Sequence, residues 1–214
     1  MKPSLFTFDI FGTVLDWQTG LTNAVRQAGY LFDPVRDMDR VVDVQGADEQ
    51  AQYRAYRDIM RDSLINAFGM APDVAVSIGA GLGAWPLFAD STAGMKALMK
   101  IAPCIAMTNS DYSHGEMIQA QLGFPLTDWI CAEEARVYKP NPAFWHIAAQ
   151  KSGVSFGRHW WHVSAYADYD LSVARELGLT CVYIPRPHCR PGFSHYQANN
   201  LLGLSKLINE LQFE

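Results

Sequence analysis

The sequence predicts an α/β fold in which a doubly wound parallel sheet carries an inserted helical cap. Two observations lead to this prediction. Short apolar segments alternate with stretches of helical periodicity, which is the order of elements in a βαβ protein. Between residues 16 and 86, however, no strand core appears, and this stretch is far longer than the few residues that usually connect a strand to the next helix.

The predicted strands are five continuous apolar segments rich in β-branched and aromatic residues. Strands that are apolar throughout, rather than alternating, are typical of a parallel sheet buried on both faces. In chain order, these segments are residues 4–8, 104–108, 129–132, 160–164 and 180–184.

The predicted helices are bounded by capping residues and glycines. Within the insertion we expect helices over 19–28 and 47–68; the latter has apolar residues at i, i+3, i+4 and i+7 and ends at Gly69. Three more helices, over 111–122, 142–151 and 170–177, each precede a glycine. We therefore expect a core domain of residues 1–14 and 88–214 and a cap domain of residues 15–87. The glycine-rich stretch 79–83 lacks the preceding strand of a dinucleotide site, so we interpret it as a hinge or helix end.

Composition excludes several classes of protein. The chain of 214 residues has 49% hydrophobic and 18% charged residues, which excludes a disordered chain. The net charge of -5 and the scattered basic residues argue against a nucleic-acid partner. No apolar segment approaches the ~20 residues of a membrane span, and the first residues do not resemble a signal peptide. Three of the four cysteines, Cys104, Cys131 and Cys181, lie in apolar segments, so we expect reduced core thiols and a cytoplasmic protein.

Polar residues gather where the predicted strands end. Asp9 ends the first strand, Thr108 and Asn109 end the second, and Asp170 follows the fourth. Lys139 precedes a helix. Ligand sites of open α/β sheets lie beyond the carboxyl ends of the strands, so these side chains are expected to form one site. Taken singly, each of them could equally be a helix cap or a surface residue.

In this order the motifs resemble those of the haloacid dehalogenase superfamily over nearly the whole chain. They are Asp9-x-Phe11-Gly12-Thr13, Thr108-Asn109, Lys139-Pro140 and an acidic stretch ending at Asp170. The resemblance implies a Rossmann-like core with a cap inserted after the first motif. Phosphatases of that superfamily carry Asp-x-Asp, whose second Asp protonates the leaving alcohol, whereas this chain has Phe11. A halide leaves without a proton, and the motif with Phe11 resembles the L-2-haloacid dehalogenase subgroup.

The resemblance also implies roles for these residues. Asp9 would displace a leaving group from C2 of a small carboxylic acid and form an ester, which water would hydrolyse. Lys139 and Thr13 would hold Asp9 ionised and in place, and Asp170 would help to activate the water. Thr108 and Asn109, with their backbone amides, would receive the substrate carboxylate. Three aromatic residues would form walls of the pocket: Phe11, Trp17 and Tyr169.

Other functions stay open at this stage. One is a related displacement, such as ring opening of azetidine-2-carboxylate; others are a magnesium-dependent phosphatase and a non-catalytic descendant that binds an acid. We expect no cofactor, because Lys139 can neutralise Asp9; a bound Mg²⁺ would use Asp9, Asp168 and Asp170. Relatives suggest a homodimer. The Trp-Arg-x-x-Gln setting in which the dehalogenase subgroup carries its halide-receiving Arg is absent from the sequence.

Overall fold

A parallel sheet forms the centre of the computed structural model, which describes residues 1–213. Its six strands lie in the order β3-β2-β1-β4-β5-β6, and every neighbouring pair is parallel. The strands are β1 (Leu5–Phe8), β2 (Cys104–Thr108), β3 (Asp128–Cys131), β4 (Trp160–Ser164), β5 (Thr180–Tyr183) and β6 (Tyr196–Gln197). This α/β architecture confirms the predicted fold class. The two-residue β6 was not predicted, because so short a strand leaves no apolar pattern.

The strand register aligns the carboxyl ends of the central strands. Phe8 of β1 pairs with Ala106 of β2 on one side and with Val163 of β4 on the other. From β1 the chain continues to β2 and β3, and then crosses to β4 on the opposite side of β1. The strand order therefore reverses at β1, and such a reversal leaves a crevice beyond the strand ends.

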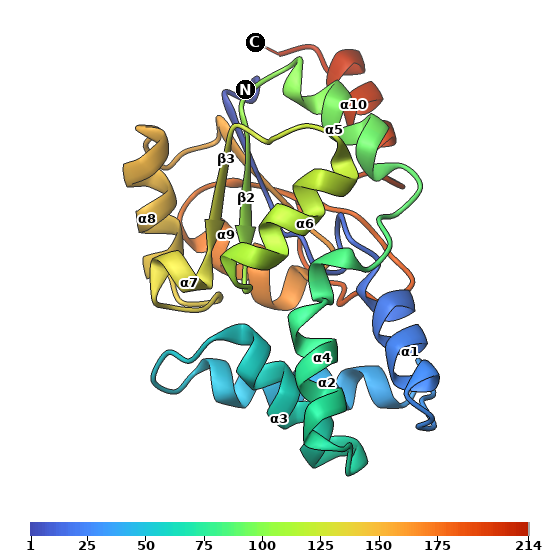
Figure 1. The fold of residues 1–214 in the computed structure, drawn as a ribbon. Coiled ribbons are helices and arrows are strands. Elements are labelled where there is room, and N and C mark those ends of the chain that lie inside the picture. Colours follow the sequence, from blue (N-terminus) through green and yellow to red (C-terminus); the bar gives the residue numbers. More distant parts are fainter. Residues whose placement is uncertain (214) are drawn as a thin grey trace.

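Helices cover both faces of the sheet. They are α5 (Ser91–Met99), α6 (Tyr112–Leu122), α7 (Ala132–Ala135), α8 (Ala143–Ser152), α9 (Ser172–Glu176) and α10 (Leu201–Glu210). In Figure 1, α5 and α6 lie in front of the sheet. Because crossover connections are right-handed and the strand order reverses at β1, α8 and α9 belong to the other face. Gly123 and Gly153 end α6 and α8 in the left-handed conformation, as their positions in the sequence predict.

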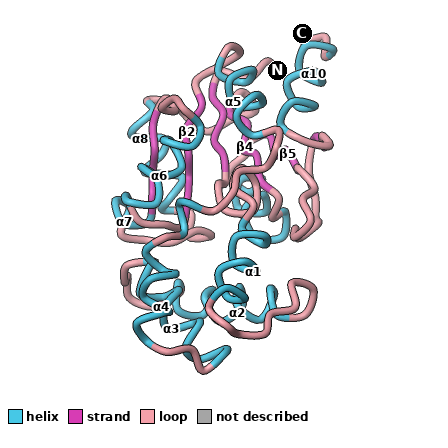
Figure 2. Tube along the Cα trace, turned by 45° about the vertical axis from the view of Figure 1, so that its right-hand side comes forward, coloured by secondary structure: helices cyan, strands magenta, loops and turns pink. Residues whose placement is uncertain are grey.

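A second group of helices fills the stretch between β1 and β2. These elements are α1 (Trp17–Gln27), α2 (Asp37–Glu49), α3 (Tyr56–Phe68), α4 (Pro72–Ala80) and the short 3₁₀ helix η1 (Leu82–Ala84). They lie at the carboxyl edge of the sheet, while both chain ends lie at the opposite edge (Figures 1 and 2). The division of the chain into a core and a cap domain remains a prediction.

The predicted helix over 47–68 is wrong. Helix α2 ends at Glu49, and α3 begins only at Tyr56. The Asp111 carboxylate accepts hydrogen bonds from the backbone N–H groups of Tyr56 (2.8 Å) and Arg57 (3.1 Å), which begin α3. Such N–H groups have no partner within a helix and need one from outside. Since Asp111 is distant in the sequence, local periodicity could not show this helix start.

One other predicted segment differs in detail, whereas the glycine-rich stretch is a helix end, as expected. The helix expected over 170–177 is a π-helical turn, Ala167–Leu171, followed by α9. The glycine-rich stretch 79–83 contains the end of α4 and the start of η1, and no strand precedes it. A Cβ at Gly79 would lie 2.6 Å from the Arg57 carbonyl oxygen, and one at Gly83 would lie 2.4 Å from that of His114. These glycines therefore serve the close packing of α4 and η1 on α3 and α6.

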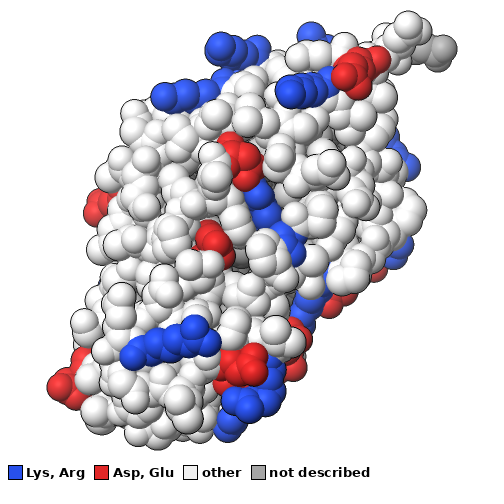
Figure 3. Space-filling model, turned by 90° about the vertical axis from the view of Figure 1, so that its right-hand side faces the viewer, with Lys and Arg blue, Asp and Glu red and all other residues white. Residues whose placement is uncertain are grey.

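The distribution of surface charge, the hydropathy of the helices and the burial of the cysteines can be compared with the expectations from composition. On the face shown in Figure 3, basic side chains are interspersed with acidic and uncharged ones. Among residues 1–213, no helix is both long and apolar enough to cross a membrane. Cys104, Cys131 and Cys181 are buried as free thiols, as their apolar sequence surroundings predict.

Candidate active site

Asp9 lies directly beyond the end of β1, at the reversal of the strand order. Its backbone N–H donates to the Val163 carbonyl of β4 at 3.0 Å, so the sheet fixes its main chain. The residue is 6% exposed, and its side chain borders a cavity. A carboxylate is thus held on a rigid element, with access to a ligand from one side only.

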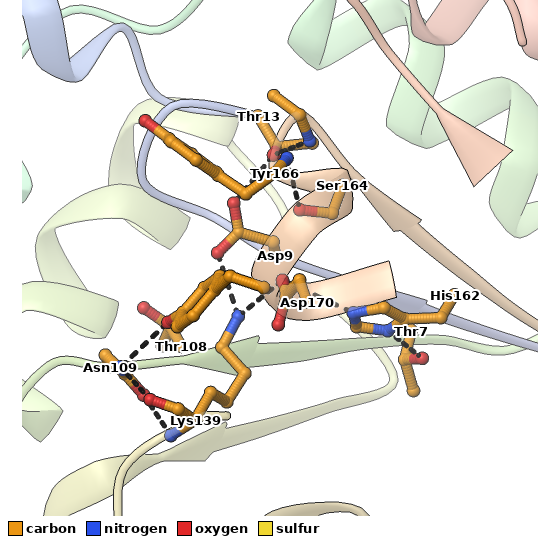
Figure 4. Close-up of polar contacts among 12 residues, drawn as sticks. Thr7, Asp9, Thr13, Thr108, Asn109, Lys139, His162, Ser164, Tyr166 and Asp170 are labelled. Atoms are coloured by element: carbon orange, nitrogen blue, oxygen red, sulfur yellow. Dashed lines mark hydrogen bonds and ion pairs between the residues drawn. The ribbon is translucent and has the colours of Figure 1, made fainter. Parts of the chain in front are cut away.

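Lys139 reaches this carboxylate from the segment before α8. Its Nζ atom donates to Asp9 Oδ1 at 2.9 Å and to Asp170 Oδ2 at 2.8 Å, and its side chain is completely buried. Figure 4 shows the ammonium group between the two carboxylates. A lysine ammonium has three N–H donors, so one remains for a ligand.

Thr13 holds the second oxygen of Asp9. Its hydroxyl donates to Asp9 Oδ2 at 2.7 Å and accepts the N–H of Ala165 at 2.9 Å. Gly12, with φ 88°, makes the turn between them, and a Cβ there would lie 2.5 Å from the hydroxyl oxygen of Tyr166. The Asp9 carboxylate is therefore oriented by a hydrogen bond to each oxygen.

Burial and charge together set the ionisation of the cluster. Burial raises the pKa of Asp9 above its usual value, and this effect outweighs the lowering by Lys139, while the charge of Asp170 raises that pKa further. Burial also opposes ionisation of Asp170, but Lys139 and then His162 lower its pKa to about 2. Lys139 does lower the pKa of Asp9, as expected from the sequence, but desolvation is the larger effect.

Behind Asp170 lies a buried polar chain that sequence analysis did not predict. His162 Nε2 lies 3.4 Å from Asp170 Oδ2, and its Nδ1 is 2.7 Å from the Thr7 hydroxyl, which also accepts the indole N–H of Trp160 at 2.7 Å. The sequence places His162 within an apolar strand, where a supporting residue cannot be told from a core residue. Asp170 Oδ1 is buried and has no hydrogen-bond partner within the described residues.

Asn109 connects three parts of the site. Its Nδ2 group lies within hydrogen-bond distance of the Lys139 carbonyl (2.9 Å), the Tyr169 hydroxyl (3.0 Å) and Glu49 Oε2 (3.0 Å), and its Oδ1 accepts the Lys139 N–H at 2.7 Å. The Asn109 side chain is thus engaged with the protein, although it was expected to receive the substrate. The backbone N–H groups of Asn109 and Ser110 have no acceptor within residues 1–213.

Asp9, Asn109 and Lys139 border a cavity of about 910 Å³ between the sheet edge and the helices that follow β1. Thr108 and Trp17 also line it, so the predicted substrate-binding residues meet at one place. Aromatic rings form much of the remaining wall: Phe11, Tyr53, Tyr56, Tyr138, Tyr166 and Tyr169. A cavity of this size, largely apolar with a few converging polar groups, is typical of a small-molecule site.

Three charged residues of the cavity wall, Asp43, Glu49 and Arg190, were not predicted from the sequence. Glu49 comes from the end of α2, and Arg190 comes from the segment after β5. Arg190 is paired with Asp39 and Asp43 of α2 at 3.1 and 2.7 Å. Arg54, Arg57 and Arg61 do not line the cavity, which leaves Arg190 as its arginine among the described residues. Neither Glu49 nor Arg190 belongs to a motif, so only the fold could reveal them.

The residues present do not fit a bound magnesium ion. Mg²⁺ requires several oxygen ligands around it, but the space between Asp9 and Asp170 holds the Lys139 ammonium. Asp168, the third acid named from the sequence, is exposed, whereas Asp9 and Asp170 are buried. No cluster of three or more potential metal ligands occurs among residues 1–213.

Comparisons with known proteins identify the family and the fold of the chain. The family model of haloacid dehalogenase-like hydrolases matches residues 3–178. A comparison with curated protein sequences finds no match.

Several solved structures share the fold at low sequence identity. The L-2-haloacid dehalogenase PA0810 is 23% identical, with a TM-score of 0.82 over 96% of this chain and 99% of that one. The L-2-haloacid dehalogenase of Xanthobacter autotrophicus with chloropropionic acid covalently bound is 14% identical (TM-score 0.82, 98% and 100% covered). The putative HAD-hydrolase YfnB of Bacillus subtilis, bound to magnesium, is also 14% identical (TM-score 0.80, 98% and 100% covered). At these identities the likeness shows the fold.

Proposed function

Because the chain belongs to the haloacid dehalogenase-like hydrolases, we propose that Asp9 displaces a leaving group from C2 of a small carboxylic acid and forms an aspartyl ester. One observation carries the proposal. The Asp9 carboxylate faces the cavity, held by Lys139 and Thr13, while Phe11 stands where phosphatases of the superfamily have an acid. A phosphate ester needs that acid for its alkoxide, whereas a halide does not.

The first step is a displacement at carbon. An oxygen of ionised Asp9 attacks C2, the bond from C2 to the leaving group breaks, and that group departs with the electron pair. The hydrogen bonds from Lys139 and Thr13 fix the carboxylate for an in-line approach, which converts an encounter into an oriented reaction.

The second step hydrolyses the ester. Water attacks the carboxyl carbon of Asp9 and loses a proton, for which the unpaired Asp170 Oδ1 is a suitable acceptor. The bond between that carbon and the ester oxygen then breaks, and the departing oxygen takes up that proton to give a 2-hydroxy acid. Asp9 is restored as a carboxylate, and the remaining proton of the water passes to solvent. Donors aimed at the Asp9 oxygens stabilise the negative charge that develops during this attack.

The substrate carboxylate requires hydrogen-bond donors on the cavity wall. The Thr108 hydroxyl, at the end of β2, lines the cavity and donates to the Ser110 hydroxyl at 3.2 Å, and the unpaired backbone N–H groups of Asn109 and Ser110 follow it. They are joined by the third N–H of the Lys139 ammonium. Since the Asn109 side chain is engaged elsewhere, we assign carboxylate binding to these groups rather than to its amide.

Isotope labelling tests the covalent mechanism. A single turnover of 2-chloropropionate in H₂¹⁸O, with enzyme in excess and each enantiomer run separately, should place ¹⁸O in the Asp9 peptide and leave the product largely unlabelled. Asp9→Asn, which keeps the shape but is a poor nucleophile, is the control and should acquire no label. Label in the product on the first turnover, with none in Asp9, would mean direct attack by water and would overturn the proposal.

A further inference from the structure

Glu49 places a second carboxyl group on the wall of the cavity that Asp9 borders. It is the last residue of α2 and is partly buried. Its Oε2 atom accepts the hydrogen bond from Asn109 at 3.0 Å. Among the described residues, Glu49 forms no ion pair with a basic side chain, and its Oε1 atom has no hydrogen-bond partner.

These surroundings favour the neutral acid. Burial raises the pKa of Glu49 to about 8, although the Asn109 hydrogen bond and the charge of Lys139 act in the opposite direction; Asp48 raises it slightly further. Because Oε2 already accepts a hydrogen from Asn109, the proton of the neutral acid belongs on Oε1. The cavity thus contains one carboxylate oriented by Lys139 and Thr13 and a second carboxyl group whose surroundings favour the neutral form with a free O–H. Acid-assisted displacement uses two carboxyl groups whose surroundings favour different protonation states.

We propose that Glu49 is the general acid that protonates the leaving atom, so that the substrates of this site include small 2-carboxylates in which that atom is the oxygen of a strained ring. The inference rests on the proposed attack of Asp9 at C2. Glu49 would supply from a helix the proton that Phe11, at the end of β1, does not supply.

Ring opening proceeds in one step that forms the aspartyl ester. An Asp9 oxygen forms a bond to C2, the bond from C2 to the ring oxygen breaks, and the electron pair stays on that oxygen. The oxygen takes the proton from Glu49 Oε1, which leaves a hydroxyl group on the ring-opened ester and an ionised Glu49. The later attack of water on the ester releases one proton to solvent, and Glu49 regains one, so the net reaction is addition of one water to the ring.

The chemistry of the leaving atom indicates that strained cyclic ethers are the substrates that need this acid. A halide is stable as an anion and gains little from an acid. A ring amine is already protonated at neutral pH and departs as a neutral amine. An ether oxygen departs as an alkoxide unless it is protonated, and in an unstrained ether the bond is too strong even then. A three-membered cyclic ether is strained and also needs a proton on its leaving oxygen. General acid catalysis typically accelerates such a reaction by a factor of about 10²–10⁴.

In-line displacement places a requirement on the positions of the nucleophile and the acid. A leaving atom must point away from the attacking oxygen. Asp9 stands on the sheet edge, while Glu49 comes from the helices that lie beyond that edge (Figure 1). The acid and the nucleophile thus come from different elements around one cavity.

The experiment compares oxirane-2-carboxylate with 2-chloropropionate as substrates of the full chain. We expect wild type to open the oxirane in an Asp9-dependent reaction. Glu49→Gln should lower kcat/KM for ring opening by about 100-fold or more, and by at least tenfold more than it lowers chloride release. The glutamine keeps an oxygen for the Asn109 hydrogen bond, and a thermal melt checks that the variant folds. Glu116→Gln, the same change at an exposed residue of α6, is the matched control and should leave both activities unaltered.

The pH profile gives a second measurement. Ring opening by wild type should fall as the pH rises through the pKa of Glu49, whereas chloride release should not. If the Glu49→Gln variant loses both activities equally, or if wild type releases chloride but does not open the oxirane, the inference is overturned and the proposed function survives. If neither substrate reacts in an Asp9-dependent way, the proposed function itself fails.

Discussion

The Lys139 ammonium lies 2.9 Å from the Asp9 carboxylate, although the two residues are 130 positions apart in the sequence. The same ammonium also contacts Asp170, so one buried cation serves two buried carboxylates. Removing one member of a buried ion pair is costly because an uncompensated charge remains in a poorly polar interior.

Replacing Lys139 should therefore damage both stability and activity. For Lys139→Met we expect a loss of about 3–5 kcal/mol in the free energy of unfolding, measured in urea at neutral pH. The rate of chloride release should fall by about 100-fold or more, since a donor to the reacting carboxylate is lost. Lys151→Met is the control: it breaks partly exposed pairs with Asp128 and Glu134 and should cost about 1 kcal/mol or less. Equal effects of the two substitutions would contradict the role of the buried cluster.

Removal of divalent metal should leave dehalogenation unchanged. The Lys139 ammonium lies between Asp9 and Asp170, the two buried carboxylates that a magnesium ion would need as ligands. We expect the same rate of chloride release in excess EDTA and in millimolar MgCl₂, and only weak hydrolysis of p-nitrophenyl phosphate under either condition. Vigorous, magnesium-dependent phosphate release would instead support a phosphatase.

As the pH is lowered, activity should begin to fall at a pH above the usual pKa of an aspartate. Burial raises the pKa of Asp9, and only its ionised form attacks carbon. As the pH falls through this raised pKa, Asp9 becomes protonated and kcat/KM for 2-chloropropionate should drop. The Thr13 hydrogen bond lowers this pKa, so Thr13→Val should shift the acid limb to higher pH. A shift to lower pH, or an unchanged limb, would show that another group controls it.

Two helix glycines should respond in opposite directions to alanine. A Cβ at Gly20 of α1 would lie 2.4 Å from Trp85 Cγ, whereas a Cβ at Gly46 of α2 would meet no atom within 4 Å. We expect Gly20→Ala to destabilise the protein by about 1–3 kcal/mol through overpacking. Gly46→Ala should stabilise it by about 0.5–1 kcal/mol, because alanine loses less backbone entropy in a helix. Urea unfolding of both variants tests this, and stabilisation by Gly20→Ala would contradict the packing of α1 on Trp85.

The strands and the polar residues at their ends could be predicted from the sequence for the same reason. A strand buried on both faces must be apolar throughout, so β2 and β4 were predicted with the bounds that the structure has. Asp9 and Thr108 follow or end such strands, and parallel strands bring those ends to one edge. Local pattern therefore predicted which residues would meet there, although their catalytic roles remain proposals.

The local sequence also determined several helix ends, but not the break between α2 and α3. Gly123 and Gly153 end their helices because they adopt the left-handed conformation at little cost. The start of α3 depends instead on the Asp111 carboxylate, which belongs to the segment before α6. A capping partner so far away in the chain leaves no trace in the periodicity of residues 47–68.

What the sequence by itself determined is the order of the five longer strands and the set of polar side chains at the sheet edge, because burial and capping act on near neighbours in the chain. Only the tertiary structure decided how those side chains are used. It placed Lys139 between two carboxylates, engaged the Asn109 amide with protein groups and brought Glu49 and Arg190 to the cavity wall. The physical reason is that ion pairing, desolvation and the shape of a cavity depend on distances between residues remote in sequence, which no local pattern records.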